Sequence, residues 1–136
     1  MAIERLAPGE PILQGAPLLV TAQRVRDYLA AVGNTHPMYQ EGMAIPPETL
    51  ATRAIREMLA RLSLPSGAVH IAQEMESLAP CAPGDHLVVD AEVVLNATRG
   101  EWRLLAVAFA VHTVAGEVAL RGKSTVMIPT RETGGP

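Results

Sequence analysis

The chain has 136 residues, which is enough for one domain and too few for two. Hydrophobic residues make up 49% of it and charged residues 18%, so disorder is excluded and a buried core is expected. The net charge is −3, and the basic residues are scattered rather than gathered into the stripe that binds nucleic acid. We therefore expect no nucleic-acid partner.

Membrane spans, leader peptides and metal centres have no signal in the sequence. The longest apolar run, residues 104–111, is far shorter than the roughly 18 residues that a span requires. The first ten residues contain Glu4 and Arg5 and no apolar stretch, so no signal peptide is expected. The single cysteine, Cys81, excludes an intrachain disulfide and a cysteine-based zinc cluster. We expect a cytoplasmic protein that binds no metal.

The first third of the chain predicts an irregular segment, a helix and a loop. Three prolines and two glycines in residues 1–20 favour an irregular lead-in, with at most a short strand over residues 17–20. Thr21 is typical of a helix N-cap and Gly33 of the residue that ends a helix, with apolar residues at helical spacing between them. Residues 34–47 are expected to form a loop.

A second and longer helix is predicted to begin at Pro47, where the missing N–H of proline is harmless. Glu48 suits the first turn, near the positive end of the helix. The apolar residues that follow at helical spacing form a broad stripe, made of Leu50, Ala51, Ala54, Ile55, Met58, Leu59 and Leu62. We expect this helix to bury one wide face.

From residue 66 onward the pattern predicts strands separated by turns. Strands are expected over residues 68–76, 86–98, 102–114 and 118–128, with turns at 80–84, 99–101 and 115–117. In the second of these strands the apolar face is predicted to comprise Leu87, Val89, Ala91, Val93 and Leu95. A single domain over residues 21–129 and a flexible tail over 130–136 complete the prediction.

This order of elements predicts an α+β fold in which a long helix packs on a curved antiparallel sheet. Residues 104–111 are apolar on both faces of their strand. The helix can cover one face, and the other face requires a second layer, most simply another subunit.

Three segments carry a family resemblance. Residues 28–39, YLAAVGNTHPMY, are similar to Tyr-Ala-x-x-x-Gly-Asp-x-Asn-Pro-x-His. Residues 44–47, AIPP, are similar to Ile-Ala-His-Gly or Ile-Ala-Pro-Pro. Residues 70–85, which contain Pro80, Pro83, Gly84 and Asp85, are similar to a segment with Pro-x-x-Pro-Gly-Asp that enters a strand. With these motifs, residues 20–128 resemble the MaoC-like group of hotdog-fold proteins, which includes (R)-specific enoyl-thioester hydratases and dehydratases.

The resemblance implies a hotdog fold, with a long central helix wrapped by a curved antiparallel sheet. It implies a homodimer, or a heterodimer with a second hotdog subunit, and reversible hydration or dehydration of a 2-enoyl/3-hydroxyacyl thioester. The substrate would be an acyl-CoA or an acyl carrier protein thioester. No cofactor is implied beyond the coenzyme A or phosphopantetheine that the substrate itself carries.

The chain departs from the family pattern where the reaction is carried out. Active members use an Asp and a His five positions apart, and these positions hold Asn34 and Tyr39 here. A carboxamide is not a base near neutral pH, and a tyrosine with a pKa of about 10 is a poor one. Pro47 also replaces a glycine whose N–H binds the thioester oxygen. If the chain is active alone, we expect His36 to act as a displaced base, Tyr39 as proton donor and Asn34 as orienting amide.

Six further residues are expected to contact substrate, namely Thr35, Pro46, Pro47, Glu48, His70 and Gln73. Structural roles compete with each of these functions: turn formation for Asn34, packing for Tyr39, helix-dipole stabilisation for Glu48 and ordinary strand packing for His70. Three alternatives to a self-sufficient hydratase stay open. These are a substrate-binding subunit beside a catalytic hotdog partner, a thioesterase with Glu48 as base, and another acyl-thioester reaction such as cyclisation.

Overall fold

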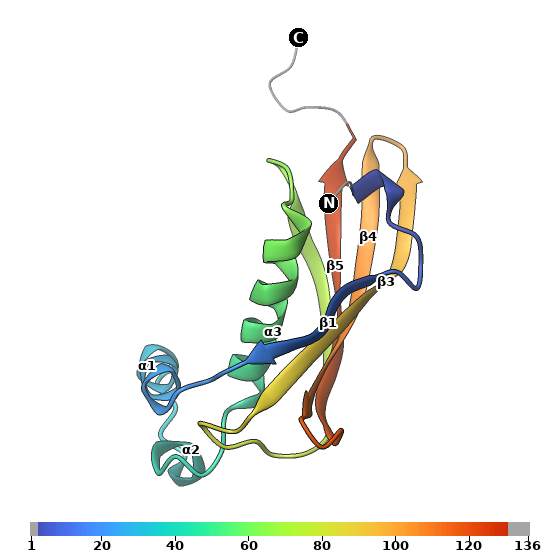
Figure 1. Ribbon diagram of the computed structural model, residues 1–136. Helices are drawn as coiled ribbons and strands as arrows, with labels where there is room; N and C mark the ends of the chain where they lie inside the picture. Colours follow the sequence, from blue (N-terminus) through green and yellow to red (C-terminus); the bar gives the residue numbers. More distant parts are fainter. Residues whose placement is uncertain (1–2, 131–136) are drawn as a thin grey trace.

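A five-stranded antiparallel sheet curves around one long helix in the computed structural model, which describes residues 3–130 (Figure 1). The strands lie in the order β1-β3-β4-β5-β2. In chain order the elements are η1 (Ile3–Arg5), β1 (Pro11–Leu18), α1 (Ala22–Val32), α2 (Pro37–Gln40), α3 (Pro47–Leu62), β2 (Val69–Ser77), β3 (Leu87–Arg99), β4 (Trp102–Thr113) and β5 (Val118–Pro129). The predicted α+β arrangement is confirmed.

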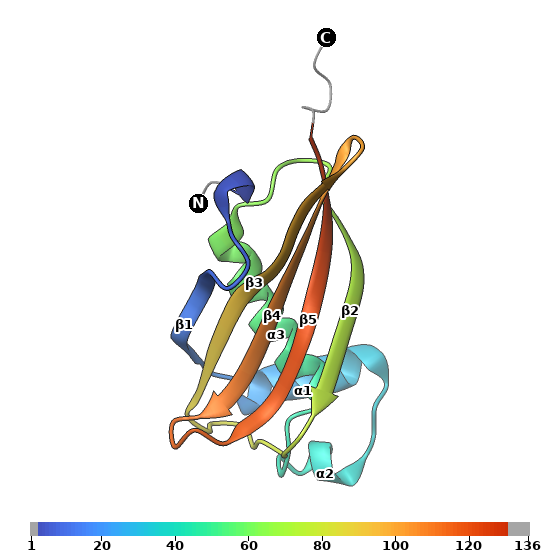
Figure 2. The same ribbon diagram turned by 90° about the vertical axis from the view of Figure 1, so that its right-hand side faces the viewer.

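The two longer helices begin and end for the local reasons that the sequence indicates. The Thr21 hydroxyl accepts the N–H of Arg24 at 3.2 Å, and Gly33 ends α1 with a φ of 69°. Helix α3 begins at Pro47, as predicted. The expected loop 34–47 was wrong in part, because residues 37–40 form the one-turn helix α2. Helices α1 and α2 lie together at one end of the molecule (Figure 2).

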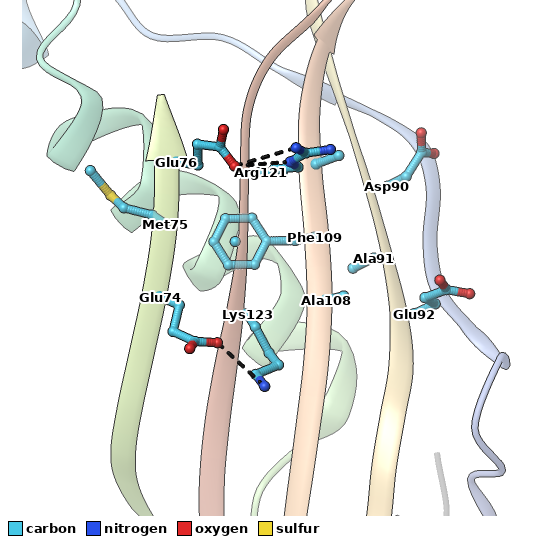
Figure 3. Close-up of a pocket in the computed structure, with 12 residues that line it drawn as sticks. Glu74, Met75, Glu76, Asp90, Ala91, Glu92, Ala108, Phe109, Arg121 and Lys123 are labelled. Carbon is cyan, nitrogen blue, oxygen red and sulfur yellow. Dashed lines mark hydrogen bonds and ion pairs between the residues drawn. The ribbon is translucent and has the colours of Figure 1, made fainter. Parts of the chain in front are cut away.

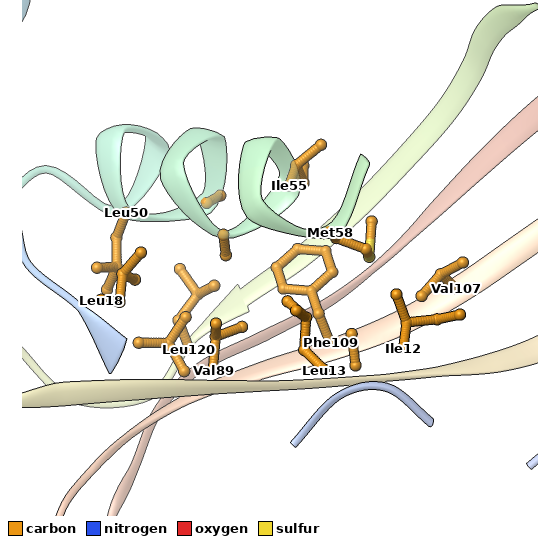
Figure 4. Packing of buried hydrophobic residues seen from close by; sticks show 14 of the residues in the cluster. Ile12, Leu13, Leu18, Leu50, Ile55, Met58, Val89, Val107, Phe109 and Leu120 are labelled. Carbon is orange, nitrogen blue, oxygen red and sulfur yellow. The ribbon is translucent and has the colours of Figure 1, made fainter. Parts of the chain in front are cut away.

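The core lies between α3 and the sheet (Figure 4). On the helix, Ala51 and Ala54 are fully buried, and their small side chains let the backbone of α3 lie close to the strands. On the sheet, the buried Phe109 points its ring toward α3 near Met58 (Figure 4). A Cβ at Gly122 would lie 2.4 Å from the carbonyl oxygen of Glu74 and 2.7 Å from the Phe109 ring. Only glycine leaves room for that ring.

The prediction of an irregular lead-in over residues 1–20 was wrong. Residues 11–18 form β1, a full strand of the sheet, and residues 3–5 form η1. Ile3 and Leu6 are buried in the core, and the side-chain amide of Asn96 donates to both of their carbonyl oxygens, at 2.9 and 2.8 Å. The predicted tail begins with Thr130, which donates its N–H to Glu101 at 2.9 Å, and otherwise lies outside the described residues.

The prediction that Leu95 shares the buried face of its strand was also wrong. Leu87, Val89, Ala91 and Val93 are buried as expected, but the register of β3 against β4 shifts between Val93 and Leu95. A bulge of one residue turns every following side chain to the other face. Leu95 is consequently 38% exposed.

The two edges of the sheet differ. Strand β1 contains Pro11 and Pro17, and its register against β3 shifts twice. Strand β2 has no proline, shifts once, and all nine of its residues are exposed. Its apolar residues include Val69 and Ile71, which are 50% and 48% exposed. An exposed, apolar edge of this kind is a template for another strand.

Candidate functional site

A pocket of about 250 Å³ lies where α2, the start of α3 and the end of β2 meet. Most of the residues that line it have apolar side chains, although polar groups make up nearly half of the exposed pocket surface. The lining includes Met38, Tyr39, Pro47, Leu50, Leu78 and Cys81. Most of these residues come from segments far apart in the sequence. The site is therefore assembled by the fold rather than by a single motif.

Two of the predicted site residues, Tyr39 and Pro47, line this pocket. Asn34, Thr35 and His36 lie in the short segment that joins α1 to α2. The structure thus brings part of the predicted catalytic loop to the pocket and leaves the rest beside it.

Asn34 is engaged in the turn that follows α1. Its side-chain oxygen accepts the N–H of His36 at 2.9 Å, and its carbonyl oxygen accepts the side-chain amide of Gln40 at 2.8 Å. This is the turn chemistry that asparagine favours. An orienting amide at this position would have to give up the contact to His36.

His36 caps the one-turn helix α2. Its Nδ1 accepts the N–H of Met38 at 3.2 Å, so in the neutral ring the proton is on Nε2. A base needs a free lone pair, and the lone pair of this ring is occupied by the cap. The ring is exposed and lies 5.5 Å, centroid to centroid, from that of Tyr39.

Tyr39 is half-buried and neighbours a second tyrosine, Tyr28 of α1. Burial raises the pKa of Tyr28, and the nearby Glu48 carboxylate and Tyr39 raise it further. A raised pKa keeps the Tyr28 phenol protonated near neutral pH. Tyr28 therefore offers a hydroxyl group and no anion.

The first turn of α3 begins with two residues that have no backbone N–H. Pro46 is buried and forms the N-cap, and Pro47 is half-buried in the pocket wall. Glu48 is exposed in the first turn and supplies the first N–H of the helix. Thr49 is 6% exposed, and its hydroxyl has no hydrogen-bond partner within residues 3–130. Sequence reasoning did not single out Thr49.

Cys81 lines the pocket, which the sequence did not indicate. It is 4% exposed, and burial raises the pKa of its thiol, with smaller contributions from the carboxylates of Asp85 and Glu117. The thiolate is the nucleophilic form, so this environment opposes covalent catalysis.

His70 and Gln73 belong to a different part of β2. The strand rises about 3.3 Å per residue, which places His70 about 23 Å from the pocket residue Ser77. The His70 Nε2 and the buried Ser124 hydroxyl lie 2.7 Å apart, bridging β2 to β5. The structure does not bring these two predicted residues to the Tyr39 pocket.

Two other kinds of feature are absent from the part of the chain that the structure describes. Within residues 3–130, no group of three His, Cys, Asp or Glu side chains could hold a metal ion. In the same range no helix is long and apolar enough to cross a membrane.

One protein-family model matches most of the chain. The model of the FAS1-like dehydratase domain region matches residues 7–121. The chain belongs to this FAS1-like dehydratase family. No curated protein matches this member of the family.

Solved structures share the fold of this FAS1-like dehydratase chain. The MaoC-like dehydratase from Rhodospirillum rubrum superposes with a TM-score of 0.77 at 20% identity, over 94% of this chain and 96% of that one. The (R)-hydratase from A. caviae gives 0.70 at 19% identity, over 86% and 96%. The HadBC (3R-hydroxyacyl-ACP dehydratase) complex from Mycobacterium tuberculosis gives 0.71 at 14% identity, over 90% and 99%. The predicted MaoC-like hotdog fold is confirmed.

Proposed function

We propose that this chain is the acyl-thioester-binding subunit of a heteromeric hotdog dehydratase. One observation carries the proposal: among the described residues that line the Tyr39 pocket there is neither a carboxylate nor an imidazole. Hydration and dehydration of an enoyl thioester require a group that accepts a proton near neutral pH. The titratable residues of this lining are Tyr39 and Cys81, a phenol and a thiol, and side chains of these two types are not ordinarily bases near neutral pH.

The partner would supply the missing base. Strand β2 ends at Ser77, and Ser77 and Leu78 also line the pocket, so a chain added to this edge would lie beside it. HadBC, a fold relative, is itself a complex of hotdog chains. A second hotdog subunit that keeps the Asp and His of the family pattern would complete the site.

The acyl thioester would occupy the Tyr39 pocket with its reacting end near Tyr39. Because Pro47 offers no N–H, the thioester oxygen would take its hydrogen bond from another donor. Coenzyme A or phosphopantetheine would enter as part of the substrate, and no separate cofactor is needed.

A second candidate is a self-sufficient hydratase. The contact between the His36 and Tyr39 rings, 5.5 Å between centroids, favours it, because it places an imidazole next to a pocket residue. For His36 to act as base, the ring would have to release the N–H of Met38.

The deciding experiment restores the family pair inside this chain. Crotonyl-CoA binding is measured by titration calorimetry, and its hydration by the loss of enoyl-thioester absorbance. We expect the wild-type chain to bind without turnover, and the double variant Asn34→Asp/Tyr39→His to hydrate crotonyl-CoA at least tenfold faster than the uncatalysed background. Turnover by the wild-type chain that is abolished in His36→Ala would establish the second candidate and overturn the first.

A matched pair of variants tests the pocket itself. Ala79→Trp fills the pocket, whereas Ala60→Trp adds the same side chain on the exposed face of α3. Binding should be lost in the first variant and unchanged in the second, with thermal melting showing that both are folded. Equal binding in the two variants would place the ligand elsewhere.

A further inference from the structure

The face of the sheet that points away from α3 carries an open groove of about 570 Å³ (Figure 3). Its floor is formed by Ala108 and Ala110 of β4. Charged side chains stand on either side: Glu92 and its neighbour Asp90 on β3, and Lys123 and Arg121 on β5. This groove is distinct from the Tyr39 pocket.

Strand register arranges the groove residues in two equivalent rows. One row reads Glu92, Ala108, Lys123 and Glu74 across β3, β4, β5 and β2, and the next reads Asp90, Ala110, Arg121 and Glu76. Each row is therefore acid, alanine, base, acid. The outer pairs are closed, with Lys123 Nζ 3.3 Å from Glu74 and Arg121 Nη2 3.3 Å from Glu76.

Beyond these two charged rows the same face is apolar. The next row comprises Leu95, Ala106, Thr125 and Ala72, and the one after it Ala97, Leu104, Met127 and Val69. Leu95 is 38% exposed and Val69 50%. An antiparallel sheet with one solvated face carries polar residues there, so these rows indicate a covered face.

We propose that a second copy of this chain covers this face, related by a two-fold axis that runs parallel to β4. Such an axis leaves every row opposite its own counterpart, so apolar rows meet apolar rows. It also exchanges the two sides of β4, which places the acidic column of β3 over the basic column of the other copy's β5. Glu92 then faces Lys123 of the second copy, and Asp90 faces Arg121 of the second copy.

The small floor residues make this contact possible. Packed sheets lie about 10 Å apart, and β3 and β5 each lie one strand spacing of about 4.8 Å from β4. Ala108 and Ala110, on the axis, allow the two β4 strands to approach at that distance. A self-complementary patch of this kind is what a two-fold interface requires. The contact uses the outward-facing side chains of β2 but neither the free backbone edge of β2 nor the Tyr39 pocket, so it does not depend on the proposed function.

Charge reversal tests the contact directly. Mass is measured by size-exclusion chromatography with light scattering, and folding by thermal melting. We expect Glu92→Lys to halve the molar mass, because Lys would face Lys123 of the second copy, and Glu92→Lys/Lys123→Glu to restore it. Glu57→Lys, the same reversal on α3, should leave the mass unchanged.

A cross-linking measurement supports the mass measurement. In a Cys81→Ser background, Ala108→Cys should link two copies efficiently with a short bis-maleimide, since this residue lies on the axis. Thr98→Cys, exposed near the end of β3, should not. An unchanged mass in folded Glu92→Lys, or equal cross-linking at positions 98 and 108, would overturn the proposal, including the case in which a different protein covers this face.

Discussion

Each edge strand of this sheet has a neighbour on one side only, β3 for β1 and β5 for β2, yet the two edges differ in how well they could pair with another chain. Strand β1 is interrupted by Pro11 and Pro17, by two register shifts, and by Gly15 at a φ of 60°. Strand β2 is uninterrupted by proline and exposed throughout. Proline and bulges prevent further pairing, whereas a regular apolar edge invites it. The difference between the edges supports the proposal that another chain would add at β2, which is the edge beside the Tyr39 pocket.

A hydrogen bond between Gly15 and the Asp90 side chain also links β1 to β3. Asp90 accepts the Gly15 N–H at 2.6 Å through one oxygen and lies 2.5 Å from the His112 Nε2 through the other. The His112 Nδ1 lies 3.1 Å from the Thr113 carbonyl oxygen. Both partners of the ring are acceptors, so the imidazolium form fits best. Strand β2 contacts the sheet through β5, with its two surface ion pairs at Glu74 and Glu76.

The largest expected effect comes from charging the β2 edge. Ile71→Lys places an ammonium group on an apolar pairing edge, so we expect this variant to lose the second hotdog subunit that binds there, while two copies of this chain still associate. Size-exclusion chromatography with light scattering on the complex with that subunit measures the loss. Leu19→Lys, which charges a 56% exposed leucine just after β1, should have no effect. If the two variants behave alike, the comparison between the edges fails.

Gly122→Ala should destabilise the side of the sheet next to β2. The new Cβ would lie 2.4 Å from the Glu74 carbonyl oxygen and 2.7 Å from the Phe109 ring, so strand and ring must both move. We expect a loss of about 2–3 kcal/mol in the free energy of unfolding, measured in urea. Gly15→Ala on β1 meets no atom within 4 Å and pays only for its positive φ, about 1 kcal/mol. A larger loss at Gly15 would contradict this order.

Asp90→Asn should loosen β1 and change the dependence of stability on pH. The Gly15 N–H and His112 lower the pKa of Asp90, and Asp90 raises the pKa of His112 above 6.5. Stability from Asp90 is present above its usual pKa of 3.8 and is lost as the pH falls through its lowered pKa. The stabilising contribution of protonated His112 is fully present below pH 6.5. It is lost as the pH rises through the raised pKa of this residue.

We expect Asp90→Asn to lower the free energy of unfolding by about 1 kcal/mol at pH 6, a value that allows for solvent screening of the half-exposed Asp90–His112 pair. The unfolding free energy of this variant should also fall less steeply than that of wild type above pH 6.5. Urea titrations between pH 5 and about 8 measure both effects. Hydrogen exchange should be faster at the Gly15 amide and unchanged in β2. A wild-type stability that does not decline above pH 6.5 would show that the pair does not titrate as described.

The smallest expected effect concerns the prolines of β1. Pro11→Thr/Pro17→Thr restores two N–H donors to an edge strand, so we expect little change in unfolding free energy, within about 0.5 kcal/mol. Larger assemblies should appear at high protein concentration, because the edge is no longer blunted. A dilution series followed by light scattering detects them, with Gln14→Thr in the same strand as control. No new assembly would mean that the bulges alone close this edge.

Local periodicity and capping predicted the elements that bury a regular face. Helix α3 and the long strands carry strong periodic patterns, so their positions were predictable. Strand β1 was missed because Pro11, Gly15 and Pro17 are breakers in isolation, although an edge strand tolerates all three. Whether a segment lies at an edge depends on its neighbours in the folded sheet, and no local pattern contains that information.

The candidate site was predictable only where a motif lay along the chain. The motifs contained Tyr39 and Pro47. Cys81 was missed because it lies in the segment that follows β2, and only the fold brings that segment to the pocket. The Asp90–His112 pair has a clear reason for being missed. Counting back from the predicted hairpin turn puts these two residues on opposite faces, and the bulge between Val93 and Leu95 brings them to the same one.

The side chain of Asn96 gives the segment before β1 a structural role. Its amide nitrogen holds the carbonyl oxygens of Ile3 and Leu6, and its oxygen accepts Arg103 at 2.8 Å, so one residue ties together three parts of the chain. A truncation that starts at residue 21 would remove two core side chains along with β1 and uncover the outer side of β3. The smallest unit able to fold cooperatively therefore includes residues 3–20, and an expression boundary drawn at the first long helix would cut through it.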